Sequence, residues 1–163
     1  MEKTPKSLRL HIGLFGRTNV GKSSLLNYIA GQDVAITSPV AGTTTDVVQK
    51  TMELLPIGPV VFLDTAGLDD VSELSGLRLK KTRKVFDMCD CIVLVAESGI
   101  WTKYEEGLLK EARSREIPVI CVLNKSDLKK TSRAFLKKIE KKVKGSMVVS
   151  CAHKGQRDAS IHA

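Results

Sequence analysis

Residues 16–23 read Gly-Arg-Thr-Asn-Val-Gly-Lys-Ser, which fits the pattern G-x-x-x-x-G-K-[ST]. The apolar run Arg9–Phe15 before this stretch predicts a strand, and the stretch from Lys22 to about Ala30 predicts a helix that Gly31 ends. In a loop of this kind, successive backbone N–H groups point inward, and the positive end of the helix adds to their attraction for anions. The stretch therefore predicts a loop that holds phosphate groups.

The rest of the chain alternates apolar runs with helix-like stretches, which is typical of an α/β protein with a mostly parallel sheet. Further strands are expected at Val47–Leu54, Val60–Asp64, Cys91–Ala96, Pro118–Leu123 and Ser146–Ser150. Further helices are expected at about Leu77–Asp87, at Lys103–Arg115 and in the basic segment Lys129–Lys144, after an N-cap at Thr131 or Ser132.

These elements predict one domain, residues 1–163, with a doubly wound α/β fold. The connection Pro56–Pro59 forces the strands on either side of it to be antiparallel, because a parallel crossover needs about a dozen residues or more. We therefore expect a six-stranded sheet that is mostly parallel, with one antiparallel strand at its edge. Only eight residues follow Gly155, so we expect the last helix of such a fold to be truncated.

Composition and charge limit the other classes of function. With 42% hydrophobic and 27% charged residues, the composition is that of a soluble globular protein, and no apolar run is long enough to span a bilayer. The chain has no secretory signal at its start and no C-x-x-C pair, which predicts a cytoplasmic protein with four reduced cysteines.

The net charge of +8 lies largely in segments 80–84 and 129–144. We interpret the second segment as an amphipathic helix with a solvated basic face, because no aromatic side chains are interleaved there to stack bases. A weak site for RNA or for an acidic partner stays open.

A second motif, Asp64-Thr65-Ala66-Gly67, ends an apolar strand. Its place predicts a carboxylate at the carboxyl edge of the sheet, where open α/β sheets bind ligands. Asp64 would hold Mg²⁺ through water, and the hydroxyl of Ser23 would bind the same ion. Lys22 would pair with the β- and γ-phosphates, and the N–H of Gly67 would sense the γ-phosphate.

A third motif, Asn124-Lys125-Ser126-Asp127, follows the fifth predicted strand and predicts selection of guanine. The carboxylate of Asp127 can accept hydrogen bonds from guanine N1–H and the 2-amino group, whereas adenine would leave it unpaired at a cost of roughly 1–3 kcal/mol or more. Asn124 would bind N7 and connect to the phosphate loop, and the stem of Lys125 would cover the base. Backbone N–H groups of Ser150-Cys151-Ala152 would face guanine O6.

In this order the three motifs resemble those of the translation-factor-like GTPases, in particular the tRNA-modification (TrmE), Era and hydrogenase-maturation branch. The chain is most similar to the FeFe-hydrogenase maturation GTPases (HydF) in four stretches within its first seventy or so residues, Thr4–Ile12, Gly42–Asp46, Met52–Leu54 with Gly58–Val60, and Asp64–Asp70. The remainder matches only as a generic GTPase domain. The resemblance implies a Ras-like P-loop fold and slow hydrolysis of GTP to GDP and phosphate, as a nucleotide switch in hydrogenase maturation.

The resemblance also implies two cation sites. Gly42–Asp46 would be the switch I segment, with Thr44 (or Thr43) completing the shell of Mg²⁺ when GTP is bound. In this branch an asparagine at the position of Asn19 helps hold K⁺ against the phosphates, with switch I carbonyl groups as further ligands. Oxygen ligands of this kind suit a hard cation.

Hydrolysis of GTP by the domain on its own is expected to be slow. Many GTPases carry a glutamine after the glycine of the second motif to orient the attacking water, and Leu68 occupies that place here. Glu73 lies three residues before Gly76, as the water-orienting glutamate does in the tRNA-modification relatives, although the spacing from Asp64 is shorter.

The residues expected to bind the nucleotide are Gly16, Arg17, Thr18, Asn19, Val20, Gly21, Lys22, Ser23, Ser24, Asn124, Lys125, Asp127, Ser150, Cys151 and Ala152. The residues expected to act in catalysis are Lys22, Thr44, Gly67 and Glu73. The expected metal ligands are Ser23, Thr44 and Asp64 for Mg²⁺ and Asn19 for K⁺.

The expected partners are GTP or GDP and other hydrogenase-maturation proteins, with a homodimer left open and neither nucleic acid nor a membrane expected. Family members carry later dimerisation and iron–sulfur domains that this sequence lacks, so no iron–sulfur cluster is expected, and we interpret the C-x-H pattern at Cys151-Ala152-His153 as coincidence. The alternative function is an RNA- or ribosome-associated GTPase of the Era/TrmE type. A third hypothesis is a module that binds GTP without turnover.

Overall fold

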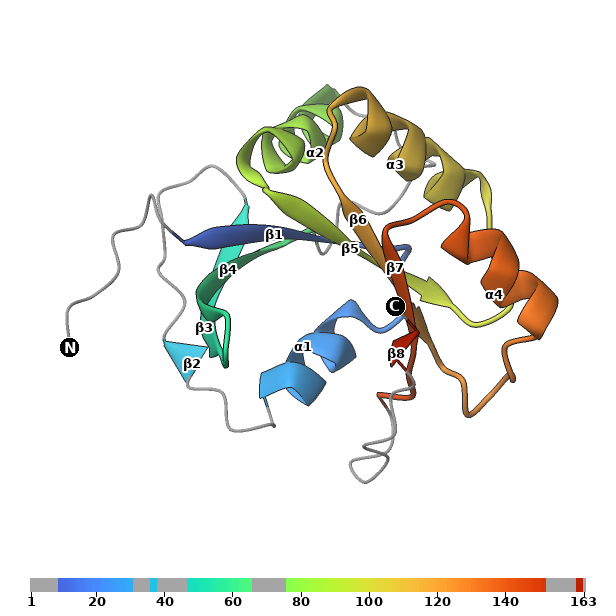
Figure 1. Cartoon of the computed structure of the whole chain (residues 1–163). Helices are drawn as coiled ribbons and strands as arrows, with labels where there is room; N and C mark the ends of the chain where they lie inside the picture. Colours follow the sequence, from blue (N-terminus) through green and yellow to red (C-terminus); the bar gives the residue numbers. More distant parts are fainter. Residues whose placement is uncertain (1–8, 31–35, 38–46, 66–75, 152–160, 163) are drawn as a thin grey trace.

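The computed structural model describes residues 9–30, 36–37, 47–65, 76–151 and 161–162. The strands are β1 (Leu10–Phe15), β2 (Ile36–Thr37), β3 (Val48–Leu54), β4 (Gly58–Asp64), β5 (Cys91–Glu97), β6 (Val119–Asn124), β7 (Gly145–Val148) and β8 (Ile161–His162). The helices are α1 (Lys22–Ala30), α2 (Gly76–Met88), α3 (Lys103–Ser114) and α4 (Arg133–Glu140). All strands belong to one sheet in the order β2-β3-β4-β1-β5-β6-β7-β8 (Figure 1).

The sheet has a parallel centre with an antiparallel strand at each side. β1 lies between β4 and β5 and is parallel to both, and β6 and β7 continue the parallel part. β3 pairs with β4 in the antiparallel sense, as the short connection predicts. The predicted doubly wound α/β fold with a six-stranded, mostly parallel sheet is therefore confirmed.

Two strands of two residues each extend this sheet. β2 pairs with β3 and β8 pairs with β7, both antiparallel, so β3 lies one place inside the edge at which it was expected. The expected truncation of the last helix concerns the chain after Gly155, of which only β8 is described. Strands of two residues carry too little periodicity to be predicted from sequence.

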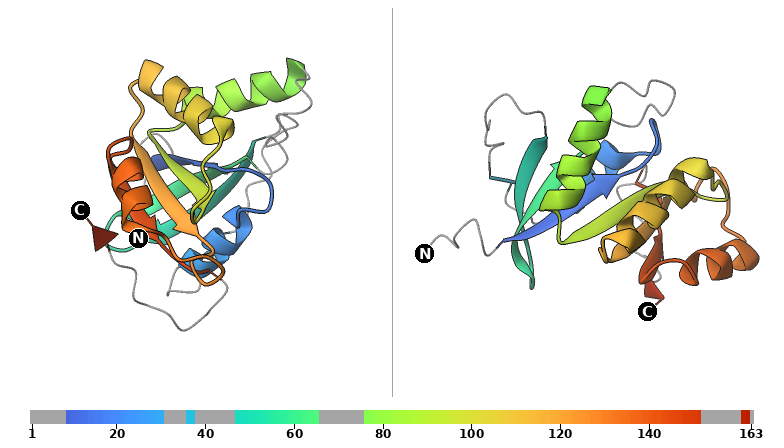
Figure 2. Two further views of the ribbon diagram at one scale, coloured as in Figure 1. Left: turned by 90° about the vertical axis from the view of Figure 1, so that its right-hand side faces the viewer. Right: turned by 90° about the horizontal axis from the view of Figure 1, so that it is seen from above.

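Helices cover both faces of the sheet. α1 lies on one face, and α2, α3 and α4 lie on the other (Figures 1 and 2). Because side chains alternate along a strand, neighbouring residues of β5 pack into different layers. Val95 belongs to the apolar cluster that includes Leu25 of α1, whereas Leu94 belongs to the cluster that includes Leu108 of α3.

α4 is shorter than the basic segment from which it was predicted. It runs over Arg133–Glu140 behind an N-cap at Ser132, the second of the two predicted caps, whose side chain accepts a hydrogen bond from the first turn. The N–H of Lys144 already donates to the carbonyl of Val119 in β6 at 3.0 Å. The residues between Glu140 and Lys144, which the charge pattern placed in the helix, therefore return the chain to the sheet instead.

The helices of the described part are short. α2 is the longest of them with 13 residues, and α4 has 8. Within the described ranges, none is long and apolar enough to cross a membrane.

All four cysteines are free thiols. Cys89 and Cys121 are buried, and burial raises the pKa of Cys89 to about 11 and that of Cys121 to about 12. Burial also raises the pKa of Cys91 and of Cys151. Because the thiolate is the nucleophile, a raised pKa lowers the reactivity of a thiol at neutral pH, most of all for the two buried cysteines.

We expect Cys121 to be strongly protected from alkylation, because its side chain is fully buried and its thiolate is disfavoured. In the native protein at about pH 8, iodoacetamide should modify Cys151 well before Cys121, which should react only after denaturant is added. Mass spectrometry of peptides taken over the time course checks this order. Equal rates at the two residues in native protein would contradict the packing described here.

Candidate functional site

Three parallel strands end at the edge of the sheet where the sequence motifs lie. β1 ends at Phe15 before the loop 16–23, β4 ends at Asp64, and β6 ends at Asn124. The segment 149–151 leaves β7 at the same edge. Open α/β sheets bind ligands outside the carboxyl ends of their strands, and this edge is therefore the candidate site.

The loop between β1 and α1 has the backbone conformation of an anion-binding loop. Asn19 and Gly21 have positive φ angles of 64° and 100°, on either side of Val20. Changes between left- and right-handed backbone conformations turn successive N–H groups toward one side, where they form a concave anion site. Val20 is only 1% exposed and anchors the loop in the apolar cluster beneath α1.

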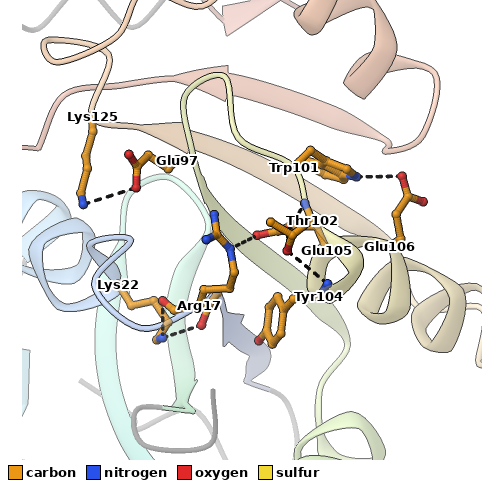
Figure 3. Close-up of polar contacts among 10 residues, drawn as sticks. Arg17, Lys22, Glu97, Trp101, Thr102, Tyr104, Glu105, Glu106 and Lys125 are labelled. Carbon is orange, nitrogen blue, oxygen red and sulfur yellow. Dashed lines mark hydrogen bonds and ion pairs between the residues drawn. The ribbon is translucent and has the colours of Figure 1, made fainter. Parts of the chain in front are cut away.

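Lys22, the first residue of α1, lies over this loop. Its side chain is buried, and Nζ donates to the carbonyl oxygens of Gly16 at 2.6 Å and Arg17 at 3.3 Å (Figure 3). Ser23 and Ser24 are exposed in the first turn of α1, where the positive end of the helix dipole lies. The loop is thus followed directly by a cationic group that contacts its carbonyls, by two exposed serines and by a helix N-terminus.

Two glycines of the loop are required by close contacts. A Cβ atom at Gly16 would lie 2.5 Å from the carbonyl oxygen of Val95 in β5. A Cβ atom at Gly21 would lie 2.2 Å from Nδ2 of Asn124, and the positive φ at this residue also favours glycine. The loop is therefore packed directly against the backbone of one strand and the side chain that ends another.

The side chain of Asn124 joins the loop to the segment after β7. Its Nδ2 donates to the carbonyl of Val20 at 3.0 Å, and its Oδ1 accepts from the N–H of Cys151 at 3.1 Å. Asn124 is 3% exposed, so both bonds lie in a shielded environment where breaking one would leave a buried polar group unpaired. The connection to the phosphate loop that the sequence predicted for this residue is present.

Asp127 lies at the exposed rim of the same region. Its Oδ1 accepts a hydrogen bond from Ser150 Oγ at 2.6 Å, which ties the motif 124–127 to the segment after β7 a second time. Lys125 has a positive φ of 60°, and its Nζ lies 3.6 Å from Oε2 of Glu97, the last residue of β5 (Figure 3). The predicted base-binding residues of the two segments are thus brought together.

Asp64 is held at the end of β4 by its neighbours. Its side chain is 6% exposed, and Oδ2 lies 3.1 Å from Nζ of Lys50 in β3. The next residue, Thr65, donates from its hydroxyl to the carbonyl of Leu14 in β1 at 2.6 Å. The carboxylate is therefore fixed beside the phosphate loop with an ammonium group against it.

Arg17 connects the loop to the start of α3. Its Nε donates to Oε1 of Glu105 at 2.7 Å, and Glu105 is 0% exposed (Figure 3). The other carboxylate oxygen of Glu105 accepts from the N–H of Thr102 at 2.7 Å, which completes the capping box of α3. Burial raises the pKa of Glu105, but the hydrogen bonds from Thr102 and Arg17 outweigh it and hold the pKa below its ordinary value.

One atom of this pair is unusual. Nη2 of Arg17 is buried and has no hydrogen-bond partner among the described residues. The guanidinium group already donates to a fully buried carboxylate, so its position depends strongly on that single ion pair.

Some predicted residues lie outside the described part of the chain, namely Thr44, Gly67, Glu73 and Ala152. Within the described ranges, no group of three or more His, Cys, Asp or Glu residues could hold a metal ion. A cation at this edge would therefore depend on Asp64, on hydroxyl oxygens and on oxygen atoms of a ligand.

Sequence reasoning missed two residues of the site, Lys50 and Glu105. The pattern Thr102-x-x-Glu105 before an apolar stretch is the signature of a capping box and could have indicated a buried role for this glutamate. Lys50 stands between Val48 and Met52 in a predicted strand, which places a lysine on an otherwise apolar face. Neither pattern indicates which distant residue Lys50 or Glu105 pairs with in the folded chain.

A sequence profile of the family described as 50S ribosome-binding GTPase matches residues 11–125, which contain most of this edge. The chain belongs to this GTPase family. Among its relatives, the tRNA modification GTPase MnmE of Prochlorococcus marinus (strain NATL2A) is 37% identical over 93% of this chain and 33% of the relative. GTPase Der of Wolinella succinogenes is 36% identical over 88% of this chain and 30% of the relative. This GTPase domain thus spans about a third of the length of these curated relatives.

Solved structures of other GTPases have the same fold as this domain. Aquifex aeolicus Era, solved as a variant bound to GDP and aluminium fluoride, aligns with a TM-score of 0.66 at 26% identity, over 86% of this chain and 50% of that chain. The G domain of the T. maritima FeoB iron transporter aligns with a TM-score of 0.60 at 24% identity, over 88% of this chain and 89% of that chain. The Ras-like P-loop GTPase fold and the likeness to Era and to the tRNA-modification GTPases are confirmed.

We expect the variant Glu105→Ala to lose both stability and nucleotide affinity, because it leaves the guanidinium of Arg17 without its partner at the start of the loop. Breaking a buried pair costs roughly 3–5 kcal/mol, with the lower end expected here because Arg17 is partly exposed. Chemical denaturation and the affinity for fluorescent GDP measure the two effects. The stability that Glu105 adds is present above the ordinary pKa of a carboxyl group and is lost as the pH falls through its lowered pKa.

The matched control is Glu106→Ala on the same helix. Glu106 is exposed and pairs with Lys142 at 2.8 Å, so its loss should cost less than about 1 kcal/mol. Equal effects of the two variants would contradict the role assigned to the Arg17–Glu105 pair.

Proposed function

We propose that this domain binds GTP with Mg²⁺ and hydrolyses it slowly to GDP and phosphate, as a nucleotide switch. The observation that carries the proposal is the double connection of Asn124, which links the phosphate loop at Val20 to the base segment at Cys151. Such a link sets the distance between a site for phosphates and a site for a purine. Membership of a GTPase family supports the same conclusion.

The loop 16–23 would bind the phosphates. Its backbone N–H groups and the N-terminus of α1 would surround the anionic oxygens, and Lys22 would exchange its contacts with loop carbonyls for the β- and γ-phosphates. Gly16, Thr18, Gly21 and Ser24 would contribute through the backbone and close approach of the loop. The Arg17 side chain would act indirectly, because it is engaged with Glu105.

The base would lie between Lys125 and the segments that contain Asp127 and Cys151. The exposed carboxylate of Asp127 would accept from guanine N1–H and the 2-amino group, and Ser150 Oγ holds it in place at 2.6 Å. Lys125 would cover the base plane with its stem. An adenine ring has neither an N1–H nor a 2-amino group to donate to this carboxylate, and the loss of these two hydrogen bonds favours GTP over ATP by roughly 1–3 kcal/mol or more.

The residues present fit a magnesium ion. Asp64 is a nearly buried carboxylate that already faces a positive charge, the ammonium of Lys50 at 3.1 Å, and Ser23 adds a hydroxyl at the start of α1. Ser23 and, through water, Asp64 would hold the ion together with Thr44. When bound, the ion would neutralise charge that develops on the phosphate oxygens.

Hydrolysis would transfer the γ-phosphoryl group to water by positioning and charge neutralisation. Lys22 and the backbone of the loop would stabilise the phosphate oxygens, and the N–H of Gly67 would report the γ-phosphate to the switch. Leu68 cannot orient water through a hydrogen bond, so we propose a slow intrinsic rate, with Glu73 as the side chain that orients water.

A role in FeFe-hydrogenase maturation is the first candidate for what the switch controls, and it rests only on the resemblance of the sequence stretches 4–12, 42–46, 52–54 with 58–60, and 64–70. The second candidate, an RNA- or ribosome-associated GTPase, is favoured by the family description and by relatives named for tRNA modification. Basic residues also line a groove between the end of α3 and the segment that follows α4, namely Arg113, Lys141, Lys142 and Lys144. Titration of the domain with tRNA and ribosomal RNA at two salt concentrations separates the candidates, because phosphate contacts give a steep salt dependence.

We expect Asp127→Asn to weaken GTP binding about tenfold to a hundredfold and to improve binding of xanthosine triphosphate, whose 2-oxo group can accept from the new amide. Competition against fluorescent GDP measures both affinities. Asp87→Asn, on the exposed side of α2, is the matched control and should change neither. Unchanged purine preference in Asp127→Asn would rule out guanine recognition by this residue.

We expect phosphate release to be faster in KCl than in NaCl at equal ionic strength, because Asn19 would hold K⁺ through its carboxamide oxygen. Asn19→Gly removes the carboxamide while glycine tolerates the φ of 64°, so this variant should lose the difference between the salts and keep its affinity for GDP. Equal rates of the unaltered domain in both salts would eliminate the K⁺ site. No release in either salt would favour a module that binds GTP without turnover.

A further inference from the structure

Lys50 occupies an unusual place in the sheet. In the antiparallel register of β3 and β4, Val48 pairs with Asp64, Lys50 with Phe62 and Met52 with Val60. Paired residues project to the same face, so Lys50 stands in a row with Phe62, Met52 and Val60, which pack in the cluster beneath α1. A β-branched or aromatic residue would suit such a row better than lysine does.

The contact that Lys50 makes gives a reason for its presence. Its Nζ reaches along the sheet to the next residue pair on the same face, where it lies 3.1 Å from Oδ2 of Asp64. The carboxylate side chain is 6% exposed and that of Lys50 is 35% exposed, so the pair is shielded from water on one side. Electrostatic interactions in such a setting are stronger than on an open surface.

The same carboxylate is the one proposed to hold Mg²⁺, and the inference that follows rests on that proposed function. Mg²⁺ carries twice the charge of the ammonium group and keeps several bound waters, which need room beside the carboxylate. An ammonium group within hydrogen-bond distance of the carboxylate would repel the ion and exclude its water shell. The ammonium group of Lys50 and a hydrated Mg²⁺ ion therefore cannot both bind Asp64 at the same time.

We propose that Lys50 is an internal competitor of Mg²⁺ for Asp64. The Lys50–Asp64 ion pair must open before the Mg²⁺-bound nucleotide is held fully, and this requirement lowers the affinity of the domain for Mg²⁺. Without Mg²⁺, the same ammonium neutralises Asp64 and reduces its repulsion of the nucleotide phosphates. Lys50 thus favours the Mg²⁺-free nucleotide complex and opposes the Mg²⁺-bound one.

These opposite effects distinguish competition from a purely structural ion pair. The variant Lys50→Met keeps the length of the aliphatic stem and removes the charged amino group. We expect the Mg²⁺ concentration that half-maximally slows the dissociation of fluorescent GDP to fall about tenfold in this variant. In excess EDTA, the affinity of the same variant for fluorescent GDP should decrease. A purely structural role would weaken binding under both conditions.

The experiment uses the whole chain with fluorescent GDP as the probe and Mg²⁺ buffered from micromolar to millimolar concentrations. Lys50→Arg should keep the midpoint of the unaltered chain, because it keeps the charge. Lys110→Met removes an exposed charge of α3 and should also leave the midpoint unchanged. Lys50→Gln, which keeps a polar but uncharged end, replaces Lys50→Met if thermal unfolding shows that the latter does not fold.

The possible failures are distinct. If the unaltered chain binds fluorescent GDP and neutralisation of Lys50 leaves the Mg²⁺ midpoint unchanged or raises it, the competition is wrong and the proposed GTPase function stands. A fall in affinity both in EDTA and in Mg²⁺ would also overturn the competition, in favour of a structural pair. If the unaltered chain binds no guanine nucleotide at any Mg²⁺ concentration, both proposals fail.

Discussion

The carboxamide of Asn124 is the contact on which the site depends. It ends β6, donates to the phosphate loop at Val20 and accepts from the base segment at Cys151. Gly21 allows this approach, because a Cβ atom there would lie 2.2 Å from the amide nitrogen. One buried side chain therefore sets the spacing between two segments that lie far apart in the sequence. Because it is 3% exposed, losing either bond would leave a polar group unpaired in the interior.

The charged side chains around the site are arranged mainly in pairs of opposite sign. Arg17 pairs with Glu105, Lys50 with Asp64, and Lys125 with Glu97. These three pairs therefore add no net positive charge to this edge. Attraction for phosphate would come from the backbone N–H groups of the loop, from the start of α1 and from Lys22. Such a site selects an anion by geometry, whereas a surface of unpaired lysines would attract any polyanion.

Much of the fold could be predicted from the sequence, because it is encoded in local patterns. The six main strands, the reversed β3 and α1 follow from apolar runs, a short connection and a glycine loop. The end of α4 could not be predicted, since it depends on the pairing of Lys144 with β6, a contact that the helical charge pattern does not indicate. The motif residues follow from spacing, whereas the partners of Arg17 and Asp64 lie 88 and 14 residues away from them and depend on the assembled sheet.

Gly16, the first residue of the phosphate loop, lies where no larger residue fits. The space where its side chain would be is 2.5 Å from the carbonyl oxygen of Val95 in the neighbouring strand. The loop therefore leaves β1 in direct contact with the main chain of β5. No flexible side chain lies between them that could move aside for a larger residue. Strands in a sheet are spaced at about 4.8 Å by their hydrogen bonds. The first residue of the phosphate loop is thus positioned by the hydrogen-bonded strands of the sheet, and any side chain at this position would have to push backbone atoms apart.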